Sequence, residues 1–174
     1  AIIGILAAIA IPAFINYVKR SKTSEAGANL KSLFQGAAAY YEAENWGLGM
    51  VAPGASAAAS THCLVGSATM QGNSAGDPTD AKQVIDWQAE TNAAEYAALN
   101  FAPADPIYYM YNVVTDGGTS VCGNLPADDT VYSFQAVGDL DEDDVNSTFT
   151  LLAGTNNDNA LYRAPGIHSA DPLE

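Results

Sequence analysis

Apolar residues dominate the start of the chain and then give way abruptly to a polar sequence. The first eighteen residues, AIIGILAAIAIPAFINYV, contain no charged side chain. A charge-free run of about this length can cross much of the hydrocarbon core of a bilayer as a helix. Lys19, Arg20 and Lys22 follow at once, and the chain after Asn45 is as polar as a soluble domain. The pattern predicts an apolar environment for the first segment and water for the rest.

The stretch from Ser24 to Trp46 repeats its apolar residues at helical spacing, which is typical of a helix with one buried face. One stripe contains Leu30, Phe34, Ala37 and Tyr41, flanked by Leu33 and Tyr40. Gly4 and Pro12 lie in the apolar run before it. In a helix interior these two residues cost about 1 and about 3 kcal/mol, so the pattern predicts a weak point there.

The remainder of the chain favours strands. An Ala/Gly/Ser-rich connection comes first, and residues 79–87 then predict a short helix, capped by Thr79 and facing the core with Val84, Ile85 and Trp87. Alternating or β-branched and aromatic runs predict strands at residues 107–114, 130–137 and 148–152. In the second strand one face would contain Tyr132, Phe134 and Ala136. A long helix followed by turn-linked antiparallel strands predicts an α+β fold, with the helix laid across the sheet.

The N-terminal sequence carries a specific family resemblance. The run IIGILAAIAIP, a Phe and a Tyr after it, and SEA at the start of the amphipathic stretch resemble the N-terminal region of bacterial type IV pilins and of the pseudopilins of type II secretion. This resemblance implies a pilin-like α+β fold. Residues 1–46 would form a membrane and filament-core helix, and residues 47–174 a globular head. It also implies that the mature chain begins upstream of Ala1, with a methylated Phe and a membrane-buried Glu.

The resemblance further implies a structural role, without chemistry in the subunit. A type IV pilin resides in the bacterial inner membrane before assembly. It then joins an extracellular homopolymer, with pilus assembly machinery and minor pilins as partners, and serves adhesion and twitching motility. The residues expected to drive assembly are Ile2, Ile3, Gly4, Ile5, Leu6, Ile9, Ile11, Pro12 and Phe14. Between Gly4 and Pro12 the helix is expected to unwind when subunits pack into a filament.

Two other functions stay open. A pseudopilin of a type II secretion system would use the same helix in a short filament that pushes exoproteins outward. A membrane-anchored, calcium-binding periplasmic protein would use the helix only as an anchor. The long region between the two cysteines favours a pilin, whereas a complete calcium loop would favour a pseudopilin.

Charge is distributed unevenly along the chain. Residues 1–31 have a net charge of +3 and residues 32–174 one of −17, which gives −14 in total. The strongly negative charge of residues 32–174 repels the phosphate backbone of nucleic acids. We therefore expect no nucleic-acid binding by the single subunit. Lys19, Arg20 and Lys22 lie where the apolar run ends and can contact anionic lipid headgroups.

Cys63 and Cys122 are the only cysteines of the chain. In an exported protein such a pair predicts one disulfide, and the alternative is two free thiols. Closing a loop of about sixty residues would stabilise the fold by roughly 4 kcal/mol in the chain-entropy model. The sequence has no Cys or His spacing that is typical of a metal or redox site.

The densest group of carboxylates is the sequence GDLDEDDVNS at residues 138–147. Asp139, Asp141 and Asp143 stand at alternate positions, as at the start of a D-x-D-x-D calcium loop. Asp144 replaces the turn glycine of an EF-hand and Thr150 its closing glutamate, which excludes an EF-hand proper. Two interpretations remain, a calcium site and an acidic hairpin turn. Apart from this calcium, no cofactor is expected.

The remaining motifs do not indicate an enzyme. Residues 72–76 have the G-x-S-x-G form of a hydrolase elbow, but a glutamine and Asp-Pro flank them instead of a buried strand and a helix. His62 and His168 are expected to be solvated surface residues, and residues 146–148 form only a formal glycan acceptor. Core and helix-packing roles are expected for Tyr40, Tyr41, Tyr108, Tyr109 and Tyr111.

Overall fold

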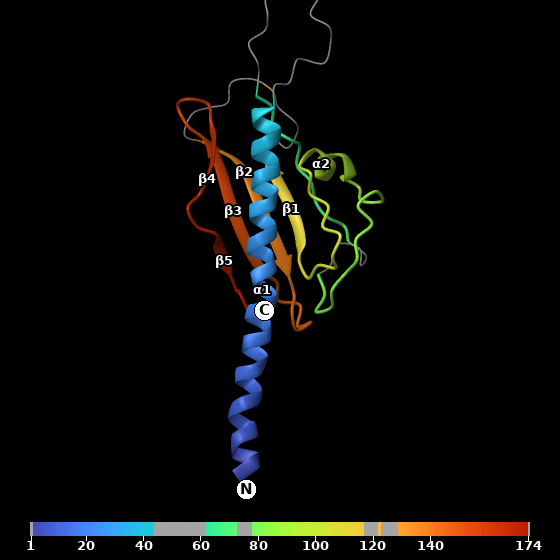
Figure 1. Ribbon diagram of the computed structural model, residues 1–174, viewed down its shortest axis with the longest axis vertical. Helices are drawn as coiled ribbons and strands as arrows, with labels where there is room; N and C mark the ends of the chain where they lie inside the picture. The colour runs from blue at the N-terminus through green and yellow to red at the C-terminus, as the bar shows by residue number, and fades with distance from the viewer. Residues whose placement is uncertain (1, 44–61, 73–77, 117–121, 123–128, 174) are drawn as a thin grey trace, which may run out of the picture.

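A single long helix lies across an antiparallel sheet in the computed structural model (Figure 1). The structure describes residues 2–43, 62–72, 78–116, 122 and 129–173. Its elements are α1 (Ile2–Glu42), α2 (Ala93–Ala98), β1 (Met110–Thr115), β2 (Thr130–Gly138), β3 (Ser147–Thr155), β4 (Leu161–Arg163) and β5 (His168–Ala170). The strand order is β1-β2-β3-β4, and β5 also pairs with β3. The predicted α+β, pilin-like fold is confirmed.

Helix α1 has two parts with different surroundings. The first part projects beyond the sheet (Figure 1), and its large apolar side chains are exposed: Ile2, Ile3, Ile5, Leu6, Ile9, Ile11, Phe14, Ile15 and Tyr17. The second part buries one face through Ala26, Leu30, Leu33, Ala37 and Tyr41. The predicted stripe is therefore right except at Phe34, which is only partly buried because Leu33 takes the central position.

Helix α1 continues without a break through Gly4 and Pro12. Pro12 has no N–H to donate to the carbonyl of Ala8, so this turn is one hydrogen bond weaker than its neighbours. The single subunit tolerates that loss. Unwinding between Gly4 and Pro12 concerns packed subunits and stays a prediction.

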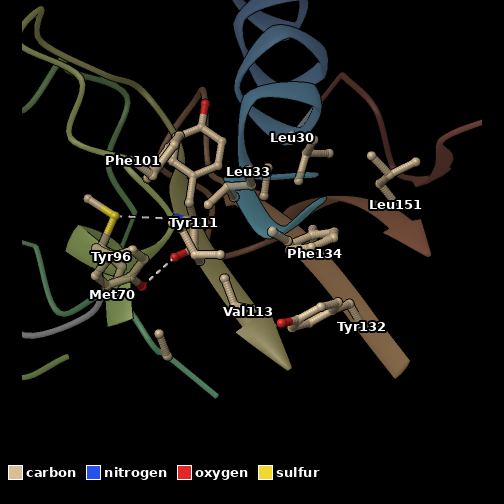
Figure 2. Close-up of a cluster of buried hydrophobic side chains, with 14 of the residues drawn as sticks. Leu30, Leu33, Met70, Tyr96, Phe101, Tyr111, Val113, Tyr132, Phe134 and Leu151 are labelled. Atoms are coloured by element: carbon tan, nitrogen blue, oxygen red, sulfur yellow. Dashed lines mark hydrogen bonds between the residues drawn. The ribbon is translucent and has the colours of Figure 1, made fainter. Parts of the chain in front are cut away.

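The core lies between the second part of α1 and the sheet. Figure 2 shows Leu30 and Leu33 of α1 close to Phe134 of β2. Tyr132, Phe134 and Ala136 are fully buried and alternate with partly exposed residues, so the predicted face of this strand is confirmed. The three long strands fall where the sequence places them, with bounds that differ by up to three residues at each end.

The short helix predicted at residues 79–87 is wrong. Gln83 instead exchanges backbone hydrogen bonds with Ile107, 2.8 and 2.9 Å long, which is an extended pairing. Thr79 donates its hydroxyl to the carbonyl of Ala81 and does not cap a helix. Val84 is 65% exposed. Tertiary pairing with the segment before β1 has overridden the local helical pattern.

An aromatic cluster joins α2 to the sheet. Trp87 and Phe101 meet edge to face, and Phe101 meets Tyr111 of β1 in the same way. Tyr96 donates its hydroxyl to the carbonyl oxygen of Tyr111 at 2.7 Å (Figure 2). Burial raises the pKa of Tyr96 and Tyr111 well above the ordinary range, so both stay neutral. With Tyr41 and Tyr109 also fully buried, and Tyr40 and Tyr108 packed against the core, the expected role of the tyrosines is confirmed.

Gly36 lets α1 approach the segment after α2. A Cβ atom at this position would overlap the carbonyl oxygen of Leu99. We expect Gly36→Ala to destabilise the chain by about 1–3 kcal/mol, as overpacking does. The matched control is Gly27→Ala on the same helix, where the new Cβ would lie 3.7 Å from Ile167 and alanine favours the helix by about 1 kcal/mol. Denaturant unfolding in detergent should separate the two variants, and equal stabilities would contradict this close packing.

The structure joins Cys63 and Cys122 by a disulfide, and the two residues also form an isolated antiparallel bridge. Replacing both by serine should lower the free energy of unfolding by roughly 2–5 kcal/mol, because the unfolded chain gains freedom. Peptide mass spectrometry without reductant should find the two cysteine peptides linked. Two thiols that react with an alkylating agent in the native protein would refute the pairing.

Candidate functional site

The exposed first part of α1 is the most distinctive surface of the molecule. Among the described residues, α1 is long and apolar enough to cross a membrane, with a mean hydropathy of 1.9 over its best 18-residue window, none of which is buried. Signal sequences near an N-terminus have the same length and composition. A continuous exposed apolar surface of this kind marks a site of contact with a membrane or with other chains.

Three side chains of α1 contact the head just after this apolar segment. Lys19 forms an ion pair with Asp141, 2.7 Å from Nζ to Oδ2. Lys22 donates to the carbonyl oxygen of Asp80 at 3.2 Å. The carboxylate of Glu25 accepts the backbone N–H of Tyr108 at 2.9 Å. At a spacing of three residues these contacts share one side of the helix and fix where α1 leaves the head.

The sequence does not predict the contacts of Lys22 and Glu25, since it gives Tyr108 only a general core or helix-packing role and Asp80 none. Asp80 and Tyr108 lie far from α1 along the chain, so these contacts are long-range. No local pattern could have identified them, because only tertiary pairing brings their segments to the helix.

The acidic loop between β2 and β3 brings the three predicted ligands together. One carboxylate oxygen from each of Asp139, Asp141 and Asp143 lies within 4.8 Å of the others. Asp139 is buried and accepts the backbone N–H groups of Asp141, Glu142 and Asp144 at 3.3, 2.7 and 3.2 Å. Asp144 has φ 67°, the left-handed conformation that a glycine would adopt at this position. The loop is therefore a tight turn around the Asp139 carboxylate.

These oxygens could hold a metal ion, but most of them already have partners. The Asp141 carboxylate faces Lys19, and that of Asp143 accepts the N–H of Val145 at 2.9 Å. Calcium takes six to eight oxygen ligands, so an ion would need further oxygens and would compete with Lys19. Repulsion from Asp80 raises the pKa of the exposed Glu142 carboxyl, a consequence of the negative charge already concentrated beside the loop.

The prediction for His62 is wrong. Its ring stacks on Tyr41, with ring centroids 4.5 Å apart, and its Nδ1 lies 2.8 Å from the carbonyl oxygen of Tyr41. A proton on Nδ1 allows the imidazole to donate to one of the last carbonyls of α1, which have no partner inside the helix. The residue thus helps to end α1, next to the Cys63 disulfide. His168, in contrast, is exposed on β5, as predicted.

Two minor motifs can also be placed. Ser147 of the formal glycan acceptor is fully buried and donates its hydroxyl to the carbonyl oxygen of Gly138 at 2.9 Å. It therefore serves to close the acidic loop. Most of the G-x-S-x-G sequence, residues 73–76, lies outside the described residues.

Comparisons with known proteins bear on the exposed helix. The chain is similar to the type IV major pilin protein PilA of Myxococcus xanthus (strain DK1622), with 71% identity over 34 residues. The matched part lies in the N-terminal region and covers 20% of this chain and 16% of that pilin. No family model matches the chain, and no solved structure matches it.

The match covers a small share of both proteins, but it falls on the segment with the most specific sequence pattern. The same segment forms the long helix whose second part packs on an antiparallel sheet. Sequence and structure therefore agree on an N-terminal segment similar to that of a type IV pilin, and on a long helix packed on an antiparallel sheet, the arrangement expected for a pilin-like fold.

Proposed function

We propose that this protein is the major structural subunit of a type IV pilus. The observation that supports this most is the pilin-type apolar segment, none of which is buried, while the later turns of the same helix bury one face in the head. Such a helix can enter a membrane or a bundle of identical helices without disturbing the fold of the head. Residues 1–46 would then form the filament core, and residues 47–174 its acidic surface.

The subunit would wait in the bacterial inner membrane, anchored by the apolar segment, and then leave it for the extracellular filament. Transfer needs an equally apolar destination, which neighbouring copies of α1 supply. Pilus assembly machinery and minor pilins would be its partners, and adhesion and twitching motility its uses. Catalysis is not part of this proposal.

A pseudopilin of type II secretion is the second candidate. It would have the same helix, and a calcium ion in the acidic loop would favour it. A membrane-anchored calcium-binding protein is a third candidate, and it would form no filament at all.

Electron microscopy of the native cell surface, with and without the gene, tests the proposal. We expect long surface filaments that bind an antibody against the head domain, that disappear on deletion and that return on complementation. Filaments that remain unlabelled and unchanged after deletion would refute the major-pilin assignment. Loss of protein secretion with an unchanged cell surface would support the pseudopilin instead.

Calcium binding by the acidic loop is a separate proposal with its own prediction. If Asp139, Asp141 and Asp143 bind one ion, calcium at a hundredfold excess over Kd should stabilise the chain by roughly 2.7 kcal/mol. Thermal unfolding in detergent should show this as a rise in Tm, which Asp141→Ala abolishes. Lys19→Gln removes the competing ammonium group and should enlarge the rise.

Magnesium at equal ionic strength is the control, because salt screening also stabilises so acidic a protein. A rise specific to calcium supports a metal site. Equal shifts with both ions would mean that the loop is a hairpin turn without a metal.

A further inference from the structure

A groove of about 450 Å³ lies beside α1 where its apolar segment ends. Tyr17 and Val18 are among its lining residues, and Lys22, Glu25, Lys82 and Tyr108 contribute polar groups to it together with Ser21 and Ser24. In a membrane-anchored subunit the exposed apolar side chains up to Tyr17 would lie in the bilayer. The groove would then lie at the level of the lipid headgroups, where an exposed aromatic residue such as Tyr17 is also favoured.

Two lysines from distant parts of the chain line this groove, and both ammonium groups lie near the same aromatic ring. The Nζ atoms of Lys22 and Lys82 lie 4.7 and 5.0 Å from the centre of the Tyr108 ring. Attraction to the ring favours both positions. Glu25 is the third charged residue, 3.9 Å from Lys82, and it also accepts the N–H of Tyr108. Together these three side chains give the groove a net charge of +1.

We propose that this groove binds the phosphate of an anionic membrane phospholipid before the subunit joins a filament; the inference rests on the membrane-anchored state of the proposed function. A phosphodiester carries one negative charge, which balances the groove and relieves the repulsion between the two ammonium groups. Its oxygens accept hydrogen bonds from both lysines. The acyl chains would continue along the apolar side of α1.

The acidic loop restricts where on this side of α1 an anionic headgroup can bind. Asp141 and Glu142 lie close to the same part of α1, since Asp141 pairs with Lys19 and Glu142 is repelled by Asp80, the backbone partner of Lys22. Anionic headgroups are therefore repelled from the loop and attracted to the groove. Lys82 distinguishes the proposal from a simple row of basic residues after a membrane segment, because it belongs to the head.

Native mass spectrometry of the full chain in nanodiscs can test this. The discs contain equal amounts of phosphatidylglycerol and phosphatidylcholine, and the lipids that stay bound to the released protein are counted. We expect enrichment of phosphatidylglycerol, which Lys22→Gln and Lys82→Gln each reduce about fivefold. Lys82→Arg should preserve it, and so should Lys31→Gln, which removes an exposed lysine of α1 outside the groove.

Each possible result decides the question. Unchanged enrichment in Lys82→Gln, with circular dichroism showing a folded chain, overturns the groove. Competition by excess inorganic phosphate in detergent, without lipid selectivity in discs, overturns the lipid as the source of the phosphate. A chain that does not enter discs contradicts the membrane-anchored state itself and so counts against the proposed function, which filament microscopy tests independently.

Discussion

Removal of residues 1–22 is expected to abolish filament formation and to yield a soluble monomer. The deleted part contains all the large apolar side chains that α1 exposes before the head begins. Each such side chain contributes about 1.5–3 kcal/mol when neighbouring helices cover it, and no other surface formed by the described residues offers a comparable driving force. The buried face of α1, from Ala26 to Tyr41, is retained. Light scattering and electron microscopy should therefore show monomers with the circular dichroism of a folded head.

Point variants make this test sharper. Ile9→Asp places one charge in the exposed apolar segment and should prevent filaments, since a charge at the centre of a bilayer or a helix bundle costs several kcal/mol. Val114→Asp places the same charge on β1, at a position that is 48% exposed, and should leave filaments intact. Filaments formed by the truncated head, or by Ile9→Asp at normal yield, would refute assembly through the helix bundle.

Much of the fold could be predicted because its signals are local. The stripe from Leu30 to Tyr41 and the alternation around Phe134 follow directly from helical and strand periodicity. The short strands β4 and β5 escaped prediction because they are three residues long and mostly exposed, without an alternating apolar face. They are strands only because β3 offers its edge to them.

The candidate sites also divide into those with a local sequence signal and those that only folding brings together. The apolar segment is one continuous stretch of the chain, and so is the acidic loop. Composition alone therefore reveals each of them. The groove at Lys22 and Lys82 and the contact of His62 with Tyr41 depend on residues brought together by folding. At residues 79–87 the same effect reversed a prediction, since pairing of Gln83 with Ile107 outweighed a weak helical pattern.

The largest stability effect is expected at the centre of the core. Phe134 is fully buried between α1 and the sheet, stacks on Tyr132 with ring centroids 5.2 Å apart, and pairs across the sheet with Val113 and Leu151. Phe134→Ala should cost about 3–5 kcal/mol, because it loses the transfer free energy of the ring and leaves a cavity under α1. That loss is a large part of the roughly 5–15 kcal/mol that stabilises a domain. Denaturant unfolding in detergent would measure it as a lower transition midpoint.

Leu152→Ala on β3 is the matched control, because this side chain is 42% exposed and points away from α1. Its effect should stay within about 1 kcal/mol, as is usual for surface positions. The core variant should also expose the face of α1 around Leu30, so it should become more sensitive to proteolysis after the apolar segment. Equal destabilisation by the two variants would mean that the helix does not pack on β2 as the structure has it, and that α1 is held to the head by its polar contacts alone.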